Sequence, residues 1–117
     1  MNAWNHSRQW RTQVVECLAE LADLDYQRRA WRGEIVGEIH SFEECVAMLC
    51  NDTNLSKDLV EGQVFSTDID KELRSLEMLV GAVNPIRPVD DILDDPALLA
   101  VRKTAARARA LLLSRSS

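Results

Sequence analysis

The sequence predicts an all-α protein, an irregular bundle of four main helices plus one or two short helices. Apolar residues recur at helical spacing in several segments, and helix-capping residues stand at the starts of those segments. Aromatic residues make up only 5% of the chain, which disfavours a β-sandwich. A length of 117 residues suits one domain, 1–117, with a core of Leu, Val and Ala, and we expect 1–6 and 114–117 to fray.

The first helix is expected over residues 8–23, with Ser7 as its cap. Its apolar stripe consists of Trp10, Val14, Cys17, Leu18 and Leu21. A kink or break is expected at residues 24–25, followed by a further helical segment over residues 26–31. Gly33 and Gly37 then end that segment.

A second main helix is expected from Ser41 to about Cys50, because Ser41 and Glu44 have the spacing of a capping box. The polar residues 51–54 are typical of a turn. A short helix over residues 56–61, stopped by Gly62, and an extended, packed pair at residues 64–65 should follow.

The third main helix should begin at Ser66 or Thr67 and run to about residue 83 on a stripe of Ile69, Leu73, Leu76, Val80 and Val83. Residues 85–94, with two prolines, are expected to be a surface linker. Asp95 then caps the last helix, with Pro96 at its first position. The stripe of this helix is Leu98, Val101, Ala105, Ala108 and Leu112.

The charges are unevenly distributed along the chain. Residues 38–95 carry fourteen acids and four cations, residues 1–37 balance to zero, and residues 96–117 carry five cations and no acid. The net charge of −5 disfavours nucleic acid and anionic membranes as partners and favours a basic partner. Many of the acids can equally be explained by solubility and by helix-start preferences.

A binding surface for a basic protein is the sharper interpretation of the acidic segment, because several of its acids lie in or beside turns. The candidate partner-binding residues are Asp52, Asp58, Glu61, Asp68, Asp70, Asp90 and Asp91. An apolar or aromatic anchor should accompany them, and Phe65 or Trp31 could serve. The arginines of residues 26–32 could form a nucleic-acid patch, but pairing with the acidic segment within the molecule is favoured.

No catalytic, cofactor or metal site is predicted. The three cysteines, Cys17, Cys45 and Cys50, lack metal-ligand spacing and are expected to be free thiols in a reducing cytosol. His6 and His40 stand apart from any nucleophile pattern, and the paired acids Asp90-Asp91 and Asp94-Asp95 are expected to cap helices and face solvent. The first residues lack a signal-peptide pattern, and no window reaches the ~18 apolar residues of a membrane span. A cytoplasmic location is therefore expected.

Three stretches resemble small bacterial immunity proteins of contact-dependent growth inhibition and related polymorphic toxin systems. They are residues 21–31, residues 41–55, and residues 92–96 with the helix that follows. The chain departs from that pattern at Cys50-Asn51-Asp52, where relatives carry an aromatic residue and two acids, and near Leu98, where they often carry an aromatic residue. The resemblance implies a non-catalytic cytosolic protein that binds and neutralises a cognate toxin domain, often a nuclease.

Two other classes stay open beside the immunity protein. A homo-oligomeric adaptor or regulator would pair the basic last helix of one subunit with the acidic segment of another, so a homodimer is one of the expected outcomes. A small enzyme is disfavoured, because the sequence offers no site for one.

Overall fold

The computed structural model describes residues 8–33 and 41–114, and in that part of the chain it contains helices and no strand. The all-α irregular bundle expected from the sequence is therefore confirmed. The expected cap Ser7, the helix-ending Gly37, the histidines His6 and His40, and the ends 1–6 and 115–117 lie outside the described residues. Ser114, placed in the fraying end above, is the last residue of a helix.

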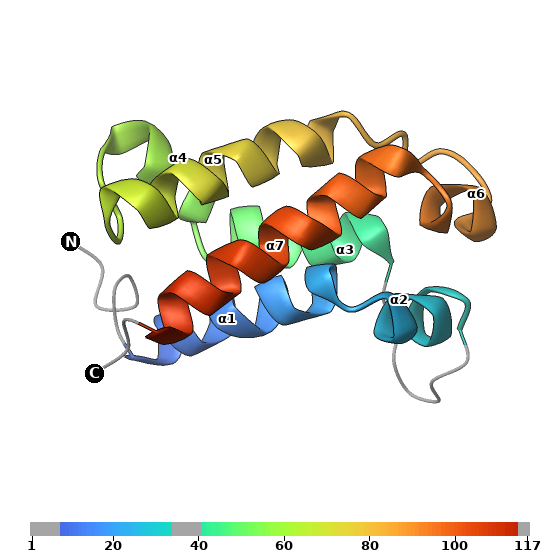
Figure 1. Ribbon diagram of the computed structural model, residues 1–117, viewed down its shortest axis with the longest axis horizontal. Helices are drawn as coiled ribbons and strands as arrows, with labels where there is room; N and C mark the ends of the chain where they lie inside the picture. The colour runs from blue at the N-terminus through green and yellow to red at the C-terminus, as the bar shows by residue number, and fades with distance from the viewer. Residues whose placement is uncertain (1–7, 34–40, 115–117) are drawn as a thin grey trace.

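Three long helices make the body of the bundle (Figure 1). They are α1 (Arg8–Ala22), α5 (Thr67–Gly81) and α7 (Pro96–Ser114). Helix α7 lies between the other two and packs against both. The stripes predicted for these helices are buried, apart from the partly buried Val80, so the 3.6-residue periodicity identified the core-facing side of each.

Four shorter helices and one π-helical turn complete the fold. They are α2 (Leu24–Trp31), α3 (Phe42–Ala47), the π-helix η1 (Met48–Asp52), α4 (Leu55–Glu61) and α6 (Val89–Leu93). Helices α3 and η1 pack on α1, α4 packs on η1 and α5, and α6 packs on α2. Figure 1 places α4 and α6 at opposite ends of the long axis, and the molecule measures 39 Å along that axis.

The predicted caps form as expected. The Ser41 side chain accepts a hydrogen bond from the Glu44 amide at 3.2 Å, and Asp95 accepts one from the Ala97 amide at 2.8 Å. The Ala97 bond, together with a hydrogen bond from Arg87, lowers the pKa of Asp95 below its ordinary value. These bonds satisfy amide groups that a helix start otherwise leaves without a partner.

The structure corrects several boundaries. The break expected at residues 24–25 lies one residue earlier, at Asp23, which accepts a hydrogen bond from the Tyr26 amide at 3.0 Å and caps α2 from Leu24 onward. The helix expected to end near Cys50 continues through η1 to Asp52, and α5 ends at Gly81 rather than Val83.

The expected linker at residues 85–94 contains the helix α6. Ile92 and Leu93 are buried, 6% and 5% exposed. Burial of these two apolar side chains favours packing of the segment on α2. Pro88 holds the entry with φ −55°.

Candidate functional site

The fold divides the seven acids predicted as one partner-binding surface into two groups. The first group comes from three elements that follow one another along the chain: η1, α4 and the start of α5. Its accessible acids are Asp52, Asp58, Glu61 and Asp68. Asp90 and Asp91 lie on α6, at the opposite end of the molecule (Figure 1). The seven residues therefore do not form one surface.

Asp70 is a correction to the predicted surface, because its side chain is buried, only 1% exposed. Its two carboxylate oxygens accept hydrogen bonds from the Val64 amide at 2.7 Å and the Phe65 amide at 2.9 Å. Position 70 follows the core residue Ile69, so the side chain turns toward the segment that enters α5. The carboxylate holds this segment against the helix and is not available to a partner.

Hydrogen bonds around Thr53 hold the end of the molecule that carries Asp52, Asp58, Glu61 and Asp68, in addition to those made by Asp70. The Trp10 indole donates from Nε1 to the Thr53 carbonyl at 2.7 Å, and the buried Thr53 hydroxyl donates to the Leu49 carbonyl. Asn54 then adopts a left-handed conformation with φ 61°, which asparagine tolerates better than most residues. This residue turns the chain from η1 into α4.

Arg74 and Phe65 join α4 to the long helices. The Arg74 guanidinium donates to the Leu59 carbonyl at 2.9 Å and to the Gly62 carbonyl at 3.3 Å, so it satisfies the carboxyl end of α4. The Phe65 ring stacks on Trp10 of α1 with a centroid distance of 5.3 Å. The end of the molecule that carries the four acids is thus held by contacts to both α1 and α5.

We call the residues Asp52, Asp58, Glu61 and Asp68 the α4 surface. Asp52, Glu61 and Asp68 are exposed and Asp58 is partly exposed. The cation nearest in sequence is Lys57, whose Nζ lies 4.0 Å from Glu61, with both side chains more than half exposed. A solvated pair of this kind contributes little to stability. Residues 52–68 hold four acids and one cation, so the α4 surface has an excess of negative charge.

Val60 is a residue of this surface that the sequence argument missed. Its side chain is 87% exposed and it stands on α4 between Asp58 and Glu61. The signal was present in the sequence: the core positions of this helix are Leu55 and Leu59, and residue 60 lies about 100° away from residue 59 around the helix axis. An exposed apolar side chain on a helix that also carries acids is the type of group that can anchor an interface.

The anchors suggested from the sequence occupy other places. Trp31 is buried, 6% exposed, with its ring edge-on to Phe42 at 5.9 Å. Phe65 is partly buried in its stack with Trp10. Trp31 is therefore a core residue and not an accessible anchor.

The acids at the α6 end are partly neutralised within the molecule. Arg32 pairs with Asp90 at 2.5 Å, and Arg87 pairs with Asp95 at 2.5 Å. On α7, Arg107 pairs with Glu72 of α5 at 3.3 Å. The intramolecular use of arginines that was favoured above is confirmed for Arg32, whereas neither Arg28 nor Arg29 makes an ion pair with a described residue.

The cysteines are free thiols in the described structure. Burial, with a smaller contribution from the Glu20 charge, raises the pKa of both Cys17 and Cys45 to about 12, and burial also raises the pKa of Cys50. Such thiols are poor nucleophiles. Within residues 8–33 and 41–114, no group of three or more His, Cys, Asp and Glu side chains is arranged to hold a metal ion.

Fold and site together define a small helical protein with an acidic surface at one end and an apolar residue within it. The chain belongs to the family described as "Domain of unknown function (DUF7945)", which it matches over residues 4–117. No curated protein and no solved structure matches the chain. Over the described residues, none of the helices combines the length and apolar character needed to cross a membrane.

Proposed function

We propose that this chain is a non-catalytic immunity protein of the cytoplasm, which binds and neutralises a cognate toxin domain with a basic surface. The observation that supports the proposal best is the α4 surface, whose four acids come from η1, α4 and the start of α5, together with the exposed Val60 on α4. Nuclease toxins are natural candidates, because a nuclease needs cations where it grips phosphate, and a carboxylate surface can occupy them. The resemblance of residues 21–31 and 41–55 to immunity proteins points in the same direction.

The carboxylates and the apolar side chain would act at different stages of binding. Clustered negative charge raises the rate of encounter with a cationic partner, and this effect weakens as salt is added. Val60 would hold the complex once formed, because burying its side chain removes apolar surface from water. The primary contact residues in this proposal are Asp52, Asp58, Glu61, Asp68 and Val60. Asp90 and Asp91 would contact only a partner large enough to reach the other end.

The decisive experiment is co-expression of this chain with the toxin domain encoded by the adjacent reading frame. Survival of the co-expressing cells supports the proposal, and death at the same rate with and without the chain refutes it. A pull-down with this chain as bait in the source cell provides the toxin domain if the adjacent frame does not.

The surface is tested by association kinetics of the purified pair. Val60→Ala should raise the dissociation constant about tenfold, from ~1.5 kcal/mol of lost apolar burial, mainly through faster release. The matched control is Ile86→Ala, because Ile86 is also 87% exposed but lies outside the α4 surface. Equal effects of the two variants would remove Val60 from the interface.

Charge reversal separates the steering from the anchoring. Glu61→Lys should slow association at low salt and change release little, and the difference should fade at high salt. Asp94→Lys, on the exposed residue after α6, makes the same change of charge at the other end of the molecule. An association rate that responds equally to both variants would show that net charge and not the α4 surface guides the encounter.

A further inference from the structure

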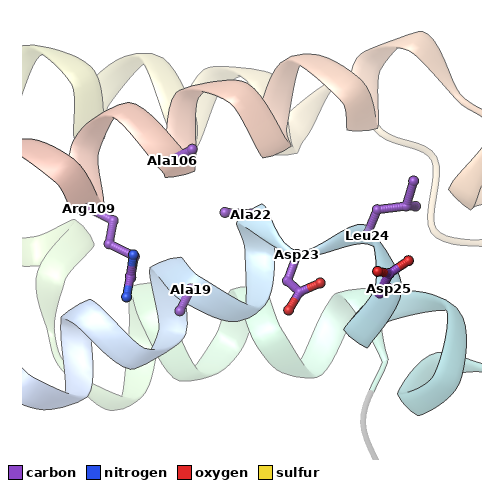
Figure 2. A pocket seen from close by; sticks show the side chains of 7 residues that line it. All are labelled: Ala19, Ala22, Asp23, Leu24, Asp25, Ala106 and Arg109. Carbon is purple, nitrogen blue, oxygen red and sulfur yellow. The ribbon is translucent and has the colours of Figure 1, made fainter.

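Two recesses in the described part of the structure differ in the charge of their walls. A groove of about 460 Å³ runs between α1 and α7, with three alanines in its middle (Figure 2). Figure 2 shows Arg109 at one end of the groove and the carboxylates of Asp23 and Asp25 at the other, so its charges favour no single class of ligand. A smaller recess of about 110 Å³ lies where α2, α3, α6 and the segment between α5 and α6 meet, and we call it the α6 recess.

The α6 recess is lined mainly by apolar side chains. They come from all four of these parts of the chain: Trp31, Phe42, Pro85, Val89 and Ile92. Trp31, Phe42 and Ile92 are 6%, 5% and 6% exposed, so a ligand atom must enter the recess to reach them. An apolar cavity of about 150 Å³ can hold benzene. A volume of about 110 Å³ therefore suits one branched aliphatic side chain.

The recess is formed before any ligand arrives. The Trp31 ring lies edge-on to Phe42 at 5.9 Å, and this contact joins the end of α2 to the start of α3. Apolar surface continues outside the recess at Ile86, which stands between the lining residues Pro85 and Arg87 and is 87% exposed. A preformed apolar pocket with few polar groups is the usual form of a ligand site.

Three polar residues, Ser41, Glu43 and Arg87, complete the lining. The Ser41 hydroxyl already caps α3, and the Arg87 guanidinium already pairs with Asp95 at 2.5 Å. Glu43 is exposed and makes no ion pair with another described residue. The lining therefore offers a partner one carboxylate that no described cation neutralises.

The surroundings of the recess add to this negative charge. Asp91 on α6 and Asp94 just after it are exposed and make no ion pair with a described residue. Among the cations of this end, Arg32 is already paired. Arg28 lies toward Arg102 of α7, because burial and the Arg28 charge together lower the pKa of Arg102, and neither arginine lines the recess. The charge available here thus favours a cationic partner.

We propose that the α6 recess binds a leucine or isoleucine side chain from a protein segment that carries lysine or arginine beside it. The aliphatic side chain fills the recess, and a neighbouring cation pairs with Glu43 at its edge. An acidic segment is selected against, because its carboxylate would lie beside Glu43 without a partner. The site does not rest on the proposed function, because α4 lies at the opposite end of the molecule (Figure 1).

A short peptide tests the site on the full chain. The probe is Gly-Lys-Leu-Lys-Gly with blocked ends, and its binding is followed by the NMR signals of the Trp31 indole N–H and the Val89 methyl groups. The dissociation constant should be about 1 mM or lower. Replacing the leucine of the peptide by serine, or both of its lysines by glutamate, should raise this constant at least about tenfold.

Variants of the chain identify the contacts. Glu43→Gln should raise the dissociation constant about threefold, because it removes the charge at the edge of the recess. Glu44→Gln is the matched control, because Glu44 is the next residue, is also exposed and lies outside the lining, and it should change the constant less than about twofold. Val89→Phe should fill the recess and prevent binding, with the helical circular dichroism of the chain unchanged.

Several results would overturn the proposal. They are the lack of a saturable change in the Trp31 and Val89 signals up to about 5 mM peptide, a serine peptide that binds as well as the leucine peptide, and a glutamate peptide that binds better. A shift of the same signals when the chain alone is diluted would give the recess to a second copy and overturn it as well. If Val89→Phe does not fold, Glu43→Gln and Glu44→Gln decide, and equal effects of these two variants would refute the pairing.

Discussion

Replacement of Asp70 by asparagine tests whether one buried carboxylate holds the segment that enters α5. The side chain is 1% exposed and accepts hydrogen bonds from two amides, Val64 at 2.7 Å and Phe65 at 2.9 Å. Asparagine has nearly the same size but only one acceptor oxygen, so one of the two amides would face an NH₂ group and lose its partner.

The magnitude follows from those two bonds. A hydrogen bond to a charged group contributes about 1.5–3 kcal/mol, and easier burial of the neutral amide offsets part of the loss. We therefore expect Asp70→Asn to lower the free energy of unfolding by about 2–3 kcal/mol. The entropy of unfolding of a chain of 117 residues is about 0.25 kcal/mol per degree. Dividing the lost free energy by this entropy gives a fall in melting temperature of about 8–12 °C.

Urea unfolding followed by circular dichroism, with calorimetry for the melting temperature, measures both quantities. The matched control is Asp52→Asn, the same chemical change on an exposed side chain, which should stay within about 0.5 kcal/mol of the natural chain. If Asp70→Asn and Asp52→Asn cost the same, the carboxylate at position 70 does not hold this segment and the reasoning is wrong.

Three further outcomes can be measured on the same chain. Trp10→Phe keeps an aromatic ring but removes the indole donor to the Thr53 carbonyl, and urea unfolding should show a loss of about 1–3 kcal/mol; no loss would mean that water replaces the donor. Cys17 and Cys45, with pKa values of about 12, should resist a thiol reagent at pH 8 until urea unfolds the chain, and rapid labelling of either of these two residues in the folded chain would contradict their burial. Asp95 has a lowered pKa in the folded state, so it stabilises the fold above its unfolded pKa and loses this contribution as the pH falls through the folded value. Asp95→Asn should therefore be less stable than the natural chain at pH 7, and this difference should shrink below the ordinary carboxyl value of 3.8; a constant difference across that range would exclude the linkage.

Local signals account for most of the fold that could be predicted. The Ser41 cap of α3 and the Asp95-Pro96 start of α7 depend on residues a few positions apart, and the structure confirms both. Helix α6 was missed because the two prolines before it, Pro85 and Pro88, suggested a linker, whereas its stability comes from packing on α2, which is distant in the sequence. Contacts between segments that are distant in the sequence produce no pattern among neighbouring residues, so local sequence signals do not predict them.

The candidate site was predictable only in part, for the same reason. Acids in the first turn of a helix usually face water, and nothing near Asp70 in the sequence shows that residues 64–65 fold back onto it. The separation of α6 from α4 also depends on tertiary packing. Val60, in contrast, could have been found from the positions of Leu55 and Leu59 alone.

The Trp10 indole has a consequence for how the acidic end would recognise a partner. One ring stacks on Phe65 and bonds the Thr53 carbonyl, so it ties together three parts of the chain: α1, the turn before α4 and the segment before α5. The backbone around Val60 is consequently ordered before any partner arrives. Recognition there would restrict side-chain rotamers but require no folding of the chain, which keeps the entropy lost on association small.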